Sequence, residues 1–228
     1  MFVDGNDVEV VKKKIKYLHL YVLSPDGKVR VSAPQRMSLS EIESFVHEKH
    51  AWISANQEKI LKRPKKQSPT YVDGEKITLF DKQFTLILNP SCKANSVTVN
   101  GDNVILNTRG ELSFEQKAKI VEKWRRAELK IAAAPLIEKW QAILGVSVNV
   151  WSVKNMKTRW GSCNVKSKRV WLNFQLSDKP SDCLEFIVAH ELCHLRVPNH
   201  SKTFKSLLSS VLPNWRDTQK RLNTFGIN

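Results

Sequence analysis

The stretch FIVAHELCHLRVPNH, from Phe186 to His200, constrains the fold more than any other part of the chain. It contains the pattern H-E-x-x-H at His190, Glu191 and His194, and His200 follows after a five-residue gap. Residues four apart lie on one face of a helix, so His190 and His194 can direct imidazole nitrogens to one point. The apolar residues around them predict a helix buried inside a domain. The two histidines would therefore be surrounded by apolar side chains that exclude water.

These histidines predict a catalytic zinc site with one Zn²⁺ per chain. A catalytic zinc takes three protein ligands and keeps a fourth position for water. His190, His194 and His200 are the candidate ligands, and Glu191 is the candidate general base, because zinc acidifies its water and a neighbouring carboxylate takes the proton. The only acidic residue after His200 is Asp217, and this scarcity favours His200 as the third ligand.

The composition indicates a globular protein with a basic surface. The chain has 228 residues, of which 41% are hydrophobic, and this suffices for a core. The formal charge of +15 is uneven, with +4 on residues 1–114 and +11 on residues 115–228. A positive field concentrates anions near the protein surface. The excess of basic residues is explained equally well if they only keep the protein soluble. We therefore expect an anionic or protein substrate, with association with DNA as one option.

The sequence indicates neither secretion nor a membrane partner. The apolar runs near the N-terminus are short and interrupted by charge, as in KKKIK at Lys12–Lys16, so neither a signal peptide nor a membrane span is predicted. The four cysteines have no C-x-x-C spacing and are expected to be reduced thiols. Cys193 points about 100° away from His194 around the helix, so we interpret it as core packing. We expect a cytoplasmic protein, and the oligomeric state stays open.

A strand-rich pattern runs up to residue 112. Residues 1–11 are expected to be a loose start. Alternating residues from Ile15 to Leu23, a turn at Ser24–Gly27 and a second strand at Val29–Ala33 predict a hairpin. Ser38 or Ser40 caps one helix that ends near Lys62, before a basic connector. The connector is Arg63–Pro69, and the further expected strands are residues 76–80, 83–88, 96–99 and 103–107.

The rest of the chain is mainly helical, with a small sheet. Ser113 and Gln116 form a capping box for a helix that Gly145 stops, and Pro135 is expected to kink or divide it. Strands are predicted at Val146–Val153 and Arg169–Phe174. Ser181 or Asp182 caps the helix with the histidines. The predicted core-facing stripe of the long helix is Ile120, Trp124, Ala127, Ile131, Leu136, Ile137, Trp140 and Leu144.

Four motifs resemble those of the YgjP-like metallopeptidases, described as metal-dependent hydrolases related to the SprT-like zincins. The motifs are MKTRWGSCN (Met156–Asn164), VWLNFQL (Val170–Leu176), VAHELCHL (Val188–Leu195) and NHSKTF (Asn199–Phe204). The similarity spans the chain, since PDGKVRVSAP near the N-terminus and LPNWRD near the C-terminus also match. We therefore predict an α+β fold, with a strand-rich module over residues 1–112 and a zincin-like hydrolase domain over residues 113–228.

The resemblance implies the same zinc ligands and the same catalytic Glu191 as the histidine pattern. It also implies that the R-W-G-S-C segment is an edge strand beside the cleft, where peptide substrates of zincins add as a further strand. Arg159, Trp160 and Asn199 are candidates for contacts with the substrate or with the zinc ligands. For Trp160, core packing is at least as good an interpretation.

Three functions are compatible with the sequence. The first is a zinc-dependent metallopeptidase. The second keeps the zinc and hydrolyses a nucleotide or phosphate ester, which the basic half of the chain attracts. The third is a nucleic-acid-associated module with a structural zinc. Glu191 and an open fourth zinc position argue against the third.

Overall fold

The computed structural model describes residues 1–23, 26–62 and 69–227, and their contacts form two compact units, one on either side of residues 63–68. Within these residues it has six α-helices and eleven strands, which confirms the α+β class. The predicted connector lies outside the described residues except for Pro69, and so do Ser24 and Pro25 of the predicted turn. Among the described residues, no helix is long and apolar enough to cross a membrane.

The first unit has a four-stranded sheet in the order β1-β2-β4-β3. β3 (His19–Leu23) and β4 (Lys28–Pro34) pair antiparallel, as the predicted hairpin requires. β2 (Asn6–Lys13) pairs in parallel with β4, and β1 (Phe2–Val3) pairs with β2. The prediction of a loose start was therefore wrong, because Val8 lies in the core of this unit.

Two helices cover this sheet where the sequence predicted one. Ser38 caps α1 (Leu39–Glu48) through a capping box with Glu41, and Lys49 separates α1 from α2 (His50–Leu61). The helical contribution to the core of the unit is Ile42, Val46 and Ile53.

The second unit begins with another four-stranded sheet, in the order β5-β6-β8-β7. Its strands lie where the sequence predicted them: β5 (Lys76–Leu79), β6 (Lys82–Asn89), β7 (Ser91–Asn100) and β8 (Asn103–Arg109). Their apolar face packs against the following helix through Val121. The sheet therefore groups with the C-terminal half, and the contacts do not divide the chain between residues 112 and 113, where the sequence placed a boundary.

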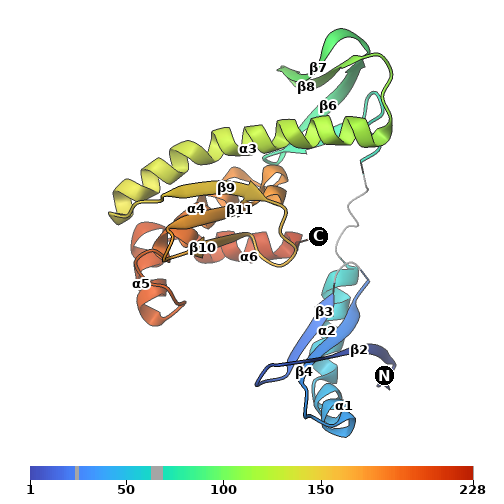
Figure 1. The fold of residues 1–228 in the computed structure, drawn as a ribbon, viewed down its shortest axis with the longest axis vertical. Coiled ribbons are helices and arrows are strands. Elements are labelled where there is room, and N and C mark those ends of the chain that lie inside the picture. The colour runs from blue at the N-terminus through green and yellow to red at the C-terminus, as the bar shows by residue number, and fades with distance from the viewer. Residues whose placement is uncertain (24–25, 63–68, 228) are drawn as a thin grey trace. The chain divides into compact units, whose positions relative to one another are not determined.

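The long helix α3 (Phe114–Leu144) is continuous and runs along both sheets of the second unit (Figure 1). The predicted capping box at Ser113 is confirmed, and Gly145 ends the helix in the left-handed conformation, φ 59°. Pro135 does not divide it. The missing N–H of Pro135 leaves one carbonyl unbonded at Ile131, which is 67% exposed, so water can bond to it.

The buried face of α3 differs from the predicted stripe. Ala127 and Ile131 are exposed, although the sequence pattern placed them inward. The reason is that the helix faces two different cores along its length, one near its start and one over its C-terminal half. The buried residues are Val121, Leu129, Ala133, Ile137, Trp140 and Leu144.

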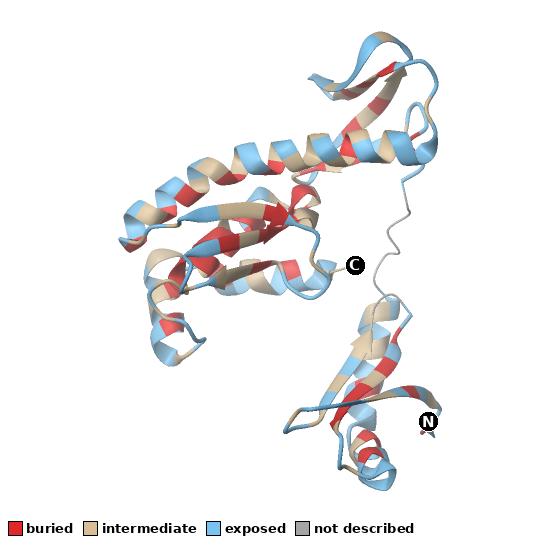
Figure 2. Cartoon of the chain, viewed as in Figure 1, coloured by how far each residue is buried: buried red, intermediate tan, exposed pale blue. Residues whose placement is uncertain are grey.

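A three-stranded sheet in the order β10-β11-β9 follows α3. β11 (Arg169–Asn173) is its centre, with β9 (Val150–Lys154) parallel to it and β10 (Gly161–Asn164) antiparallel, so β10 is an edge strand. Figure 2 shows buried residues along these strands and on the inward side of α3. The remaining elements are the 3₁₀ helix η1 (Phe174–Asp178), α4 (Ser181–Cys193), α5 (Lys202–Val211) and α6 (Trp215–Phe225).

Candidate metal centre

The helix α4 places the H-E-x-x-H pattern inside the largest core of the second unit. Almost every residue of α4 from Cys183 to Cys193 is buried, because the helix packs against α3, β10, β11 and α6. Its N-terminal cap position is Pro180, without a side-chain cap bond, so Ser181 and Asp182 lie in the first turn and the prediction that they cap the helix was wrong. The predicted buried helix is confirmed.

Three histidines meet at the C-terminal end of α4. His190 lies in the last turn, His194 is the C-cap residue, and His200 comes back to them after the turn at Val197–Asn199. One nitrogen from each ring lies within 4.8 Å of the others, and Nε2 of His190 is 2.9 Å from Nε2 of His200. The sequence therefore identified the three side chains that the fold brings together.

The aromatic ring of Phe204, in the first turn of α5, lies against all three imidazoles. Its centroid is 4.9 Å from that of His190, 4.7 Å from that of His194 and 4.9 Å from that of His200. Ser201 caps α5 and so fixes where Phe204 projects. The apolar ring of Phe204 packs against the three imidazoles and restricts their rotation.

The lowered pKa values of two of these histidines favour the binding of a cation. Burial, with the neighbouring histidines, lowers the pKa of His190 to about 3, so this ring is neutral at physiological pH. Burial also lowers the pKa of His194, whose Nδ1 lies 3.2 Å from the carbonyl oxygen of Val197. That contact holds the proton on Nδ1 and leaves Nε2 as a lone-pair donor. Three imidazoles that converge on one point, two of them with lowered pKa values, are a donor set that fits a divalent transition metal.

Glu191 follows the first histidine and is only 5% exposed. Burial raises the pKa of this carboxyl to about 8, and Arg159 acts in the opposite direction. The backbone of Gly161 in β10 passes directly over the carboxylate, so that a Cβ there would lie 2.5 Å from Oε1 of Glu191. Only glycine permits this approach. Glu191 thus lies between α4 and the edge strand.

A cavity of about 550 Å³ contains the three histidines and Glu191. One wall is the segment from Arg159 to Cys163, so two of the predicted contact residues, Arg159 and Trp160, line it. Trp160 also packs against the core, as the alternative interpretation of this residue proposed, and its contact with a substrate stays a prediction. Asn199 is not among the lining residues; its Oδ1 accepts a hydrogen bond from the backbone N–H of Ser201.

The opposite wall comes from α6, which no sequence motif identified as part of a site. Its contributions are Gln219, Leu222 and Asn223. A helical pattern reveals that α6 is amphipathic, but it gives no signal of which tertiary partner the helix meets. Cys193 is buried in the core, as expected, whereas Cys163 lines the cavity as a thiol, because burial raises its pKa to about 11.

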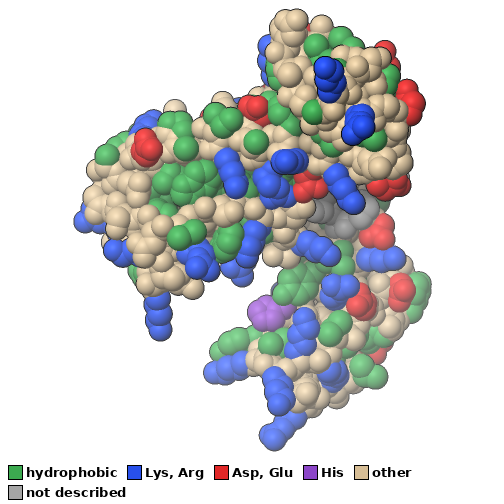
Figure 3. Space-filling model, turned by 45° about the horizontal axis from the view of Figure 1, so that its top comes forward, with side chains coloured by type: hydrophobic (Ala, Val, Ile, Leu, Met, Phe, Trp, Pro, Cys, Tyr) green, Lys and Arg blue, Asp and Glu red, His purple; other side chains and the backbone are tan. Residues whose placement is uncertain are grey.

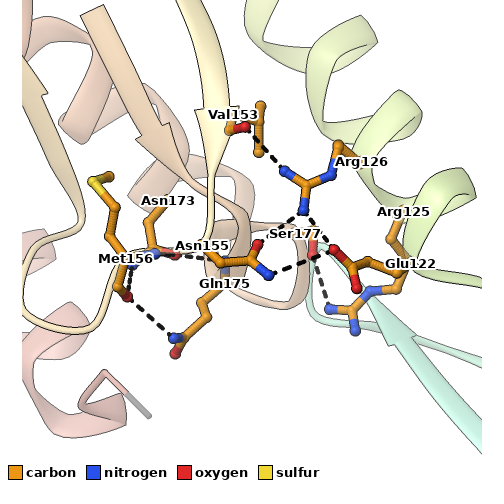
Figure 4. Close-up of polar contacts among 9 residues, drawn as sticks. All are labelled: Glu122, Arg125, Arg126, Val153, Asn155, Met156, Asn173, Gln175 and Ser177. Atoms are coloured by element: carbon orange, nitrogen blue, oxygen red, sulfur yellow. Dashed lines mark hydrogen bonds and ion pairs between the residues drawn. The ribbon is translucent and has the colours of Figure 1, made fainter. Parts of the chain in front are cut away.

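A buried amide holds the loop that leads into β10. Asn173 is fully buried, and its Nδ2 donates hydrogen bonds to the carbonyls of Met156 (2.8 Å; Figure 4) and Arg159 (2.7 Å). Its backbone N–H donates to the carbonyl of Trp160. At the start of the loop, Arg126 of α3 bonds to the carbonyl of Val153 and to Asn155 (Figure 4). These bonds fix the wall of the cavity that carries Arg159 and Trp160.

Three imidazoles and a buried carboxylate, facing one cavity at the end of a buried helix, define the site of a metal-dependent hydrolase. The chain belongs to the YgjP-like family: the family model described as "YgjP-like, metallopeptidase domain" matches residues 16–225. The resemblance found in the four sequence motifs is therefore confirmed. No curated protein matches the chain.

Two solved structures are similar to part of the chain. They are the metallopeptidase zymogens abylysin of Pyrococcus abyssi and jannalysin of Methanocaldococcus jannaschii. Abylysin is 23% identical with a TM-score of 0.38, over 40% of this chain and 92% of its own. Jannalysin is 22% identical with a TM-score of 0.36, over 40% of this chain and 86% of its own.

Proposed function

We propose that the chain is a zinc-dependent peptidase, in which His190, His194 and His200 hold one Zn²⁺ and Glu191 is the general base. The observation that carries the proposal is the convergence of three ligand nitrogens beside a buried carboxylate in one cavity. Structural zinc sites are mostly built from cysteines, whereas catalytic sites use three ligands such as these and keep one position open. This comparison argues against the alternative of a structural zinc.

Zinc held by His190, His194 and His200 would supply a positive centre that acidifies water and polarises a substrate carbonyl. Glu191, next to the first ligand, takes the proton of the attacking water and then gives it to the leaving amine. Burial makes this carboxylate a stronger base than an exposed one, because it raises its pKa. Arg159 favours the ionised form, which a base requires.

The edge strand β10 supports a peptide as the substrate. β11 pairs with one side of β10, and in the order of the sheet no strand lies on its other side. Residues 161–163 of this strand line the cavity with Glu191. An extended peptide can add to such an edge through backbone hydrogen bonds, which would bring its carbonyl groups past the histidines.

The test compares the zinc-loaded protein with Glu191→Gln on casein and on a nucleotide panel. We expect casein turnover to fall at least about 100-fold in Glu191→Gln, with unchanged zinc content, and zinc content to fall in His200→Ala. Glu185→Gln is the matched control, because Glu185 lies on the same helix but pairs with Lys139. Turnover of nucleotides alone, lost in Glu191→Gln, would contradict a peptidase.

One observation favours the second candidate, a nucleotide or phosphate-ester hydrolase. Arg159 is a cation at the cavity, and Glu191 is the only acidic residue among the described lining residues. A guanidinium in this position can bind phosphate oxygens. If a phosphate ester is the substrate, Arg159→Gln raises its KM and leaves casein cleavage unchanged. If Arg159→Gln instead impairs casein cleavage and leaves the KM for the phosphate ester unchanged, Arg159 contacts the peptide substrate.

A further inference from the structure

A long stretch of the second unit is basic and contains no acidic residue. Between Glu138 and Asp178 the sequence has no Asp or Glu. This stretch forms the sheet β9-β10-β11 and its connecting loops. The cations within it are Lys139, Lys154, Lys157, Arg159, Lys166, Lys168 and Arg169.

The two faces of this sheet differ in character. Side chains alternate along a strand, so Trp151 and Val153 face one way, and Ser152 and Lys154 the other. Trp151 packs against the core that contains α3 and α4. Trp171 pairs in register with Ser152, on the opposite face, and among the described residues it does not belong to any core cluster.

Trp171 lies between two cations on this opposite face. Lys154 Nζ is 3.7 Å from the centroid of its ring, and the Arg169 guanidinium is 5.9 Å away. Trp171 is half-buried, and its neighbours in register on the adjacent strands are small, Ser152 and Ser162, so part of the indole stays exposed. We call Ser152, Lys154, Ser162, Arg169 and Trp171 the Trp171 face.

Among the described residues, no ion pair joins Lys154 or Arg169 to an acidic side chain. Glu122, on α3, approaches the end of β9 at Asn155, but it already pairs with Arg126 at 2.5 Å. In Figure 3, Lys and Arg side chains lie beside an apolar surface of the second unit. An anion bound at the Trp171 face would therefore lie near Lys154 and Arg169, beside the ring of Trp171.

We propose that the Trp171 face binds single-stranded nucleic acid. Trp171 stacks on one base, and Lys154 and Arg169 contact the phosphates on either side of it. Aromatic rings flanked by cations on a sheet are the physical basis of single-strand binding, because every base has a π-face and every linkage a charge. In a duplex the faces of the bases are already stacked, so the ring discriminates against it.

An acidic protein segment is the competing partner for such a surface, and the ring decides between the two. A carboxylate gains from Lys154 and Arg169 alone, whereas a base also gains from Trp171. Apart from Ser162, which also lines the cavity at the edge strand, the Trp171 face lies on the opposite side of the sheet from α4, so binding there needs neither the histidines nor a metal. The inference is therefore independent of the proposed peptidase activity.

The experiment measures fluorescence anisotropy of a labelled oligothymidylate, about 15 nucleotides long, with the full chain. We expect Trp171→Ala to weaken binding about tenfold, and Trp171→Phe to restore most of it, because a ring remains. Trp52→Ala is the matched control, since Trp52 is an exposed tryptophan (47%) of the first unit. Thermal unfolding of each variant shows whether the fold is intact.

The charges give a second, independent measurement. Lys154→Ser with Arg169→Ser should reduce the slope of log affinity against log salt by about 1.4, from about 0.7 per phosphate contact. The same change at Lys59, on α2, and at Lys62, the C-cap residue of α2, should leave the slope unchanged. The proposal is overturned if the wild type does not bind, if a folded Trp171→Ala binds as tightly as the wild type, or if duplex or polyglutamate competes as well as the single strand.

Discussion

Glu191 is a buried acidic side chain, and its ionised form is unfavourable because the effect of burial outweighs the charge of Arg159. In the unfolded chain its pKa is near the ordinary value of 4.5, whereas burial raises it to about 8 in the fold. Between these values the unfolded chain has lost the proton and the folded chain retains it. Stability contributed by this group therefore falls as the pH rises from about 4.5 to about 8.

The metal-free protein should show this loss. In chelator, we expect Glu191→Gln to be more stable than the wild type at pH 8, by a few kcal/mol as an order of magnitude, and the difference to shrink toward pH 4.5. Urea unfolding at several pH values measures it. His190 titrates in both proteins, so its effect cancels in the comparison. Parallel stability curves for the two proteins would contradict the buried, protonated carboxyl.

Gly161 is the residue that permits the edge strand to lie on the carboxylate. Gly161→Ala places a methyl group 2.5 Å from Oε1 of Glu191, so one of the two must move. We expect casein turnover to fall about tenfold or more and stability to fall by about 1–3 kcal/mol. Lys166→Ala, in the turn after β10, is the control. Full activity in Gly161→Ala would show that Glu191 can move freely.

At the scale of elements, the loop before β10 depends on one amide. Asn173→Ala removes two part-buried hydrogen bonds, to the carbonyl groups of Met156 and Arg159, and we expect a loss of about 1–3 kcal/mol in stability. Because the loop carries Arg159 and Trp160, KM should rise more than kcat falls. Asn149→Ala, an exposed amide that bonds to the carbonyl of Ser167, is the control. Equal stability of the two variants would contradict this role.

Local signals predicted the elements well. The capping box at Ser113 and the glycine after Leu144 set the ends of α3, because helix ends depend on a few adjacent residues. The histidine cluster was also local, since four-residue spacing and a short turn bring the rings together. Pro135 misled the prediction, because its effect depends on whether the freed carbonyl meets solvent, which only the fold decides.

At the scale of the whole molecule, sequence patterns predicted fewer of the observed features than they did for single elements. The parallel pairing of β2 with β4 joins segments about 20 residues apart through backbone bonds, and neither segment contains a signal for the other. The same holds for α6, whose Gln219 and Asn223 complete the cavity. Contacts between distant elements follow from packing, so the sequence predicted a basic connector at Arg63–Pro69 but not that the contacts divide the chain there.

Each hydrophobic core draws its residues from one unit only. One core uses residues up to Ile53, and the other two use residues from Tyr71 onward. We therefore expect a fragment of residues 69–228 to fold with a single cooperative transition and to bind zinc with the stoichiometry of the full chain. Calorimetry and metal analysis measure both. An unfolded fragment would show that the first unit is required for stability.

The helix α3 contributes Val121 to one core and Leu129 to Leu144 to the other. Each inserted residue would rotate one set of contacts by about 100° relative to the other and lengthen the helix by about 1.5 Å. A single insertion between Val121 and Leu129 would thus turn one buried face of α3 toward solvent. Substitutions on the exposed face of α3 change neither set of core contacts. Insertions and deletions in this short interval should be far less tolerated than point changes, which makes α3 a fixed spacer between the two sheets.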